Sequence, residues 1–265
     1  MGDWIQEVQR PKTLAIFFSS GDLGDVGRHA VVAALELPPT VVGKVLVLAR
    51  NAREALLVSR WECGCPGGQH GNMEKDRRLQ IIEIDVTREA ITPFLEDVDA
   101  IITCLGNRQP FHDDVVAYTG TDHVVQSMLA MQVHRICMLS SVGLGDDWPP
   151  LHWHHYGRIL QGMFRTVCWR QFQDLSGAEL AIRQNDHLLD FLVARAVVVE
   201  EDDVAPTGRW MLQFQKDDPP PDAYLAHLDC ARFLVQEAVL PRLSRQAVVV
   251  GGVPTEEGAQ DSGTS

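Results

Sequence analysis

Three glycines follow the first apolar run of the chain at a spacing suited to holding phosphate groups. Gly21, Gly24 and Gly27 form a G-x-x-G-x-x-G pattern directly after a short apolar run at 13–18. Glycine permits a tight turn between a strand and a helix, and it lets the backbone come close to a diphosphate. The unpaired N–H groups at the start of the next helix would face the phosphates. Without a ligand, the same pattern would be only a tight strand-to-helix turn.

The residues of this turn would make the contacts of such a site. We expect binding through Ser20, Gly21, Leu23, Gly24, Asp25, Val26 and Gly27. Ser19 and Ser20 could donate further hydrogen bonds. Two acids, Asp22 and Asp25, stand in the turn, where negative charge opposes an anionic ligand. They leave open a fold that binds no nucleotide and serves only as an interaction module.

The second apolar run ends in LARNAR, from Leu48 to Arg53, and carries arginines where an acid would favour NAD. Asp or Glu at this place accepts a hydrogen bond from the ribose 2′-hydroxyl, whereas arginine suits the 2′-phosphate of NADP. We therefore predict NADP(H) as the cofactor, with Arg50 and Arg53 at the 2′-phosphate and Arg28 as a further local cation. The alternative is that both are ordinary surface residues.

Further cofactor contacts are expected where later strands end. Asp85 and Val86 close the third strand, at a place that lies near the adenine in folds of this kind. Asp85 could contact the exocyclic amine of the adenine or a backbone donor, or it could cap the helix that follows, and the sequence leaves both roles open. The turn after the fourth strand should line the middle of the cofactor through Leu105, Gly106, Asn107 and Arg108.

Apolar runs alternate with helix-length segments along the chain, which predicts a doubly wound α/β fold. The strands are expected at 13–18, 44–50, 79–86, 99–106, 134–143, 190–199 and 246–252. Because Val, Ile and Leu occupy both faces of these strands, we expect a parallel sheet covered by helices on both sides. We predict a single Rossmann-type domain over 1–254, with an insertion loop at 61–78 and a disordered tail at 255–265.

In order and spacing, these segments resemble the atypical short-chain dehydrogenase/reductases, specifically the NmrA-like and biliverdin reductase B (flavin reductase) branch. The resemblance rests on the glycine turn and on the segments LARNAR, IDVT, DAIITCLGNRQP, HRICMLSSVG, HLLDFLVARA and AHLDCARFLVQEA. It implies an NADPH-dependent reductase that passes hydride to a flavin-like or other planar acceptor. The chain departs from the pattern at Asp22-Leu23, in place of a small pair, and at Ala196, in place of proline. It also lacks the histidine that follows the sixth strand in biliverdin reductase B.

In a reductase of this type, the protein mainly positions the acceptor against the nicotinamide, because solvent can supply the proton. Short-chain dehydrogenases normally use Tyr-x-x-x-Lys, but none of the three tyrosines here has lysine four residues on. By the resemblance, Ser140 or Ser141 would lie near the nicotinamide, although a Ser-Ser pair could equally be part of a turn. Tyr156 follows a candidate active-site loop. The missing Tyr-Lys pair motivates an alternative, a non-catalytic NADP(H)-binding NmrA-like regulator or scaffold.

Composition limits the partners of the protein. A formal net charge of −13 argues against binding to nucleic acid or an anionic membrane, and no apolar stretch is long enough to span a bilayer. The six cysteines do not resemble a disulfide framework, and Cys63 and Cys65 lack the second pair of a zinc site, so no metal is expected. We expect a cytoplasmic protein that acts on a small molecule. Its oligomeric state stays open.

Overall fold

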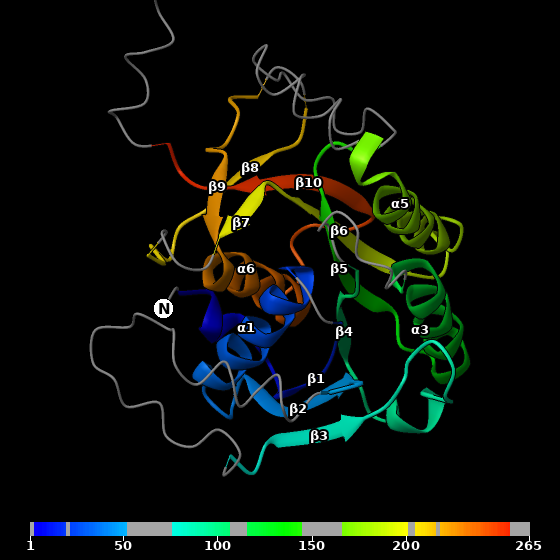
Figure 1. The fold of residues 1–265 in the computed structure, drawn as a ribbon. Coiled ribbons are helices and arrows are strands. Elements are labelled where there is room, and N and C mark those ends of the chain that lie inside the picture. Colours follow the sequence, from blue (N-terminus) through cyan, green and yellow to red (C-terminus); the bar gives the residue numbers. More distant parts are fainter. Residues whose placement is uncertain are drawn as a thin grey trace, which may run out of the picture.

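A mostly parallel sheet runs through the middle of the molecule (Figure 1). The computed structural model describes residues 3–19, 22–51, 76–106, 116–144, 166–200, 205–215 and 218–254. Within these ranges, eight strands form one sheet in the order β3-β2-β1-β4-β5-β6-β10-β8, and β7 pairs with β9 in a second sheet. The pairing of β10 with β8 is antiparallel, and the other strand pairs are parallel.

The elements have the following bounds. The strands of the large sheet are β1 (Lys12–Phe18), β2 (Val42–Ala49), β3 (Leu79–Glu83), β4 (Ala100–Cys104), β5 (Arg135–Ser141), β6 (Asp190–Ala196), β8 (Met211–Gln213) and β10 (Gln246–Gly251). The small sheet consists of β7 (Val198–Glu200) and β9 (Tyr224–Ala226). The helices are α1 (Asp22–Glu36), α3 (Ala117–Met131), α5 (Trp169–Arg183) and α6 (His227–Val239), with short 3-10 helices η1 (Asp3–Glu7) and η3 (Thr92–Phe94).

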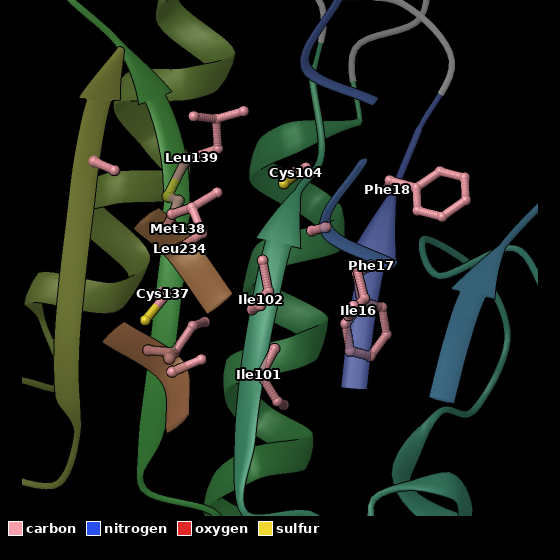
Figure 2. Close-up of a cluster of buried hydrophobic side chains, with 14 of the residues drawn as sticks. Ile16, Phe17, Phe18, Ile101, Ile102, Cys104, Cys137, Met138, Leu139 and Leu234 are labelled. Atoms are coloured by element: carbon pink, nitrogen blue, oxygen red, sulfur yellow. The ribbon is translucent and has the colours of Figure 1, made fainter. Parts of the chain in front are cut away.

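Helices cover both faces of the sheet. In Figure 1, α1 and α6 lie side by side on one face, and α3 and α5 lie together on the other. The central strands are apolar over most of their length, and most of their side chains are buried on both faces of the sheet. Figure 2 shows part of this core, with Phe17 from β1, Ile102 from β4 and Leu139 from β5. The predicted doubly wound α/β fold with a Rossmann-type sheet is confirmed.

The strand order reverses between β1 and β4. From β1 the chain builds outward through β2 to β3, and from β4 it builds in the opposite direction through β5 to β6. Ligands of open α/β sheets bind at such a switch point, beyond the carboxyl ends of the strands. A ligand-binding site is therefore expected at the residues that follow β1, β2, β4 and β5.

Several element bounds differ from the prediction. The expected strand 190–199 is divided into β6 and β7, because the chain pairs with β10 as far as Ala196 and with β9 from Val198 onward. The expected strand 79–86 ends at Glu83, since the following residues turn around Asp85. The three-residue strands β8 and β9 were not predicted, because strands this short carry no readable alternation.

The insertion loop predicted at 61–78 lies mostly outside the described residues, as does the tail at 255–265. Its final residue, Arg78, is described and bonds to the end of α1. The guanidinium donates to the backbone oxygens of Leu35 at 2.6 Å and Leu37 at 2.7 Å. Because α1 has no basic residue in its own last turn, Arg78 supplies the positive charge that favours this helix terminus. Within the described residues, no helix is long and apolar enough to cross a membrane.

Candidate functional site

Two glycines of the predicted phosphate turn are required by close packing. A Cβ atom on Gly24 would collide with the backbone oxygen of Ser19, and one on Gly27 would collide with the side chain of Phe18. The same atom on Gly27 would lie 3.1 Å from the Cβ of Cys104 on β4. The first turn of α1 thus lies directly against the carboxyl end of β1. This is the position in which helix N–H groups can face an anion.

Replacing Gly24 with alanine should therefore destabilise the fold. We expect Gly24→Ala to lower the free energy of unfolding by about 1–3 kcal/mol, because the neighbouring atom is backbone and cannot move aside alone. Urea denaturation followed by far-UV circular dichroism measures this change. Gly177→Ala in α5 is the matched control, since its Cβ would meet only the half-exposed ring of Tyr118. An equal loss in both variants would contradict the packing role of Gly24.

The structure pairs the charge of Asp25 with a cation. Its carboxylate forms an ion pair with Arg28, one turn further along α1, and both side chains are largely buried. The negative charge of Asp25 is thus balanced within the helix itself. The predicted contact Val26 is completely buried, and Leu23 lies in the first turn of α1.

Arg50 follows β2 and reaches the end of the neighbouring strand. Its Nε lies 3.2 Å from Oδ2 of Asp85, and its side chain is 45% exposed. The other oxygen of Asp85 accepts hydrogen bonds from the backbone N–H of Thr87 at 3.0 Å and from its hydroxyl at 2.6 Å. The Thr87 hydroxyl lowers the pKa of Asp85, with a smaller contribution from the Arg50 charge. Asp85 therefore holds the turn after β3 and also holds Arg50. The residues directly after it form a turn and not the helix that the capping alternative predicted.

The predicted cofactor contacts that follow β3 and β4 are mostly buried residues. Val86 and Leu105 are buried against α3, where a Cβ on Gly120 would lie 2.8 Å from Leu105 and 3.3 Å from Val86. Gly106 has a φ of 124°, a backbone conformation that favours glycine. Any contact of Val86 or Leu105 with a cofactor would therefore involve their backbone atoms.

The two serines at the end of β5 have different surroundings. The hydroxyl of Ser140 donates to Oε1 of Glu179 at 2.6 Å, inside a network that also contains Arg195. The guanidinium of Arg195 bonds to both carboxylate oxygens of Glu179, at 3.0 and 2.5 Å, and both side chains are 3% exposed. Neighbouring strand residues point to opposite faces, so Ser141 faces away from this network. The hydroxyl of Ser141 donates to the backbone oxygen of Val142 at 3.1 Å, and its role near a substrate stays a prediction.

Six predicted site residues lie outside the described residues, and their roles stay predictions: Ser20, Gly21, Arg53, Asn107, Arg108 and Tyr156. Sequence reasoning missed the Arg50–Asp85 pair and the network around Glu179. A signal for the network was present, because an arginine inside the apolar strand β6 needs a buried carboxylate partner. No comparable signal named Glu179 among the acids of the chain.

Residues 67–239 match the sequence model of a protein family described as NAD(P)H-binding. The match covers more than half of the chain. The protein belongs to this NAD(P)H-binding family. The matched range runs from before β3 to the end of α6, so the NAD(P)H-binding assignment does not depend on the glycine turn. No curated protein sequence matches this chain.

Several solved structures share the fold of this chain. A short-chain dehydrogenase/reductase from Veillonella parvula, solved in complex with NADP, has a TM-score of 0.64 and 11% identity, with 90% of this chain and 94% of that chain covered. The oxidoreductase YlbE from Lactococcus lactis has a TM-score of 0.60 and 16% identity, covering 93% and 95%. A Rossmann-fold NAD(P)-binding family protein from Shigella flexneri has a TM-score of 0.55 and 14% identity, covering 92% and 97%. At these identities the likeness shows the fold.

The resemblance predicted from the sequence is thus confirmed at the level of an NAD(P)H-binding family whose fold is shared with a short-chain dehydrogenase/reductase. The narrower likeness to the biliverdin reductase B branch stays a prediction.

Proposed function

We propose that this NAD(P)H-binding protein is a cytoplasmic, NADP(H)-dependent oxidoreductase that passes hydride to a flavin-like or other planar small molecule. The observation that carries the choice of NADP is the position of Arg50, directly after β2. β2 lies beside β1 in parallel, so Arg50 and the glycine turn share one edge of the sheet. The adenosine ribose arrives at this position in dinucleotide-binding folds. The NADP bound to the Veillonella parvula protein agrees with the proposal.

Each part of the site has a role in this proposal. The first N–H groups of α1, with the partial positive charge of the helix terminus, face the diphosphate. Arg50 bonds to the 2′-phosphate while Asp85 holds its Nε edge in place. Ser141, at the end of β5, orients the reacting groups. The nicotinamide supplies the hydride when the cofactor is bound, and solvent supplies the proton.

Turnover tests the proposal directly. Purified protein mixed with NADPH and FMN, FAD or a linear tetrapyrrole should oxidise NADPH, as followed by its absorbance at 340 nm. No turnover with a broad panel of planar acceptors, by protein that binds NADPH, would reject the reductase.

Ser141→Ala should slow this reaction. Loss of one orienting hydrogen bond is worth about 1 kcal/mol, which corresponds to a roughly fivefold lower kcat. Ser140→Ala is the comparison, since its hydroxyl bonds to buried Glu179 and its loss should mainly lower the melting temperature. A kcat of wild-type size in Ser141→Ala would remove Ser141 from the proposed mechanism.

A second candidate function is a non-catalytic NADP(H)-dependent regulator or scaffold. It is favoured by the absence of lysine four residues after each of the three tyrosines. A regulator would bind NADP(H), with an affinity that differs between the oxidised and reduced forms, and would show no turnover.

A further inference from the structure

The hydroxyl of Ser19 joins the two turns that flank the switch point of the sheet. It donates a hydrogen bond to the backbone oxygen of Gly106 at 3.1 Å and accepts one from the backbone N–H of the same residue at 3.0 Å. The two residues are 87 positions apart in the chain. A serine hydroxyl can donate and accept at once, so one side chain engages both polar groups of the Gly106 backbone.

These two hydrogen bonds extend the pairing of β1 with β4 beyond the last backbone pair, with a side chain in place of a backbone group. The backbone pairing of the two strands ends at Phe18 and Cys104. Gly106 has left the strand conformation, with its φ of 124°, so a regular rung is no longer available there. The Ser19 hydroxyl replaces this missing backbone pair with its two hydrogen bonds to Gly106. The backbone of Ser19 is held at the same time, since its carbonyl oxygen lies against Gly24 of α1.

The hydrogen-bonded pair of Ser19 and Gly106, called the clip below, lies in the middle of the path that a bound dinucleotide would take. Along the edge of the sheet, Arg50 follows β2, the glycine turn follows β1, Gly106 follows β4 and Ser141 ends β5. These strands span three spacings of about 4.8 Å, or roughly 14 Å. A dinucleotide with its 2′-phosphate at Arg50 and its nicotinamide near Ser141 must therefore cross the step from β1 to β4, which Ser19 bridges.

We propose that Ser19 is a positioning residue that fixes Gly106, after β4, relative to the first turn of α1, and thereby places the nicotinamide half of the cofactor. The inference rests on the proposed function. It also changes the part expected of Gly106, whose N–H and carbonyl are engaged by Ser19. Gly106 is buried, so its backbone N–H and carbonyl serve to hold the residues after β4 in place, and the Ser19 hydroxyl that bonds to them does not bond to phosphate.

Two ligands separate this role from a general effect on the site. Adenosine 2′,5′-bisphosphate reaches Arg50 and the phosphate turn, whereas NADP⁺ also extends across β4. In Ser19→Ala, calorimetric titration should show a roughly tenfold weaker affinity for NADP⁺, from the two lost hydrogen bonds. The affinity for the bisphosphate should change less than about twofold, because the adenosine half lies on the other side of the switch point.

Ser127→Ala is the matched control. It removes a buried hydroxyl that accepts a hydrogen bond from Thr92 at 3.0 Å, on α3 and away from the sheet edge. This variant should lose thermal stability to a similar degree and bind both ligands as the wild type does.

Three results would overturn the inference. Equal weakening of both ligands in Ser19→Ala would indicate general disruption of the phosphate turn, and unchanged affinity for both would show that the clip positions nothing. Wild-type protein that binds neither ligand would reject the proposed function itself, and the role of Ser19 with it. In the first two outcomes the wild-type protein still binds NADP⁺, so failure of the Ser19 inference is distinguishable from failure of the proposed function.

Discussion

Glu179→Ala is expected to lower the free energy of unfolding by about 3–5 kcal/mol, the largest effect of any substitution considered for this chain. Removal of the carboxylate leaves the guanidinium of Arg195 buried, without the oxygens to which it bonds at 3.0 and 2.5 Å. The hydroxyl of Ser140 loses its acceptor as well. These three side chains join β5, β6 and α5, so the loss should appear in the global unfolding transition, measured by urea denaturation.

Glu36→Ala provides the control for this variant. Glu36 also lies on a helix and pairs with an arginine, Arg232, at 3.1 Å, but both side chains are partly exposed. Breaking such a pair costs at most about 1 kcal/mol. Equal losses in the two variants would contradict the account of a desolvated network. Adding Arg195→Met to Glu179→Ala should recover part of the stability, because it removes the buried positive charge that has lost the Glu179 carboxylate.

Arg50→Ala is expected to weaken NADP⁺ binding by roughly ten- to a hundredfold, since a lost hydrogen bond to a charged group costs about 1.5–3 kcal/mol. The affinity for NAD⁺ should barely change, because NAD⁺ carries a hydroxyl where NADP⁺ carries a phosphate. Isothermal titration calorimetry with both nucleotides measures the selectivity directly.

Arg88→Ala controls for the change in net charge near the same site. The Nε of Arg88 lies 3.9 Å from the carboxylate of Asp85, and its side chain is 82% exposed. Removing it takes away one positive charge close to Arg50 without removing the proposed phosphate ligand. The assignment of Arg50 fails if Arg88→Ala weakens NADP⁺ binding as much, or if Arg50→Ala weakens NAD⁺ binding equally.

The sheet was predictable because its signals are local. Runs such as the one at β1 are apolar on both faces, which only a strand covered on both sides satisfies. Gly24 and Gly27 were recognised by their spacing after that strand. The structure adds that both positions are closed to a Cβ by contact with β1.

The partners of the polar groups could not be predicted, because they come from distant segments. Ser140 and Glu179 are 39 residues apart, and Ser19 and Gly106 are 87 apart. Which side chains meet is fixed by strand register and helix placement, which the sequence does not display. For the same reason the two serines of β5 looked equivalent, although neighbouring strand residues face opposite sides of the sheet.

The most direct test of the central claim is calorimetric titration of the wild-type protein with NADPH and NADH at the same ionic strength. The claim is that the first turn of α1 holds a diphosphate while Arg50 bonds to a further phosphate. It requires one NADPH bound per chain, at least about tenfold more tightly than NADH, as expected for a charge-assisted contact. Folded protein that binds neither nucleotide, or binds both equally, would contradict it.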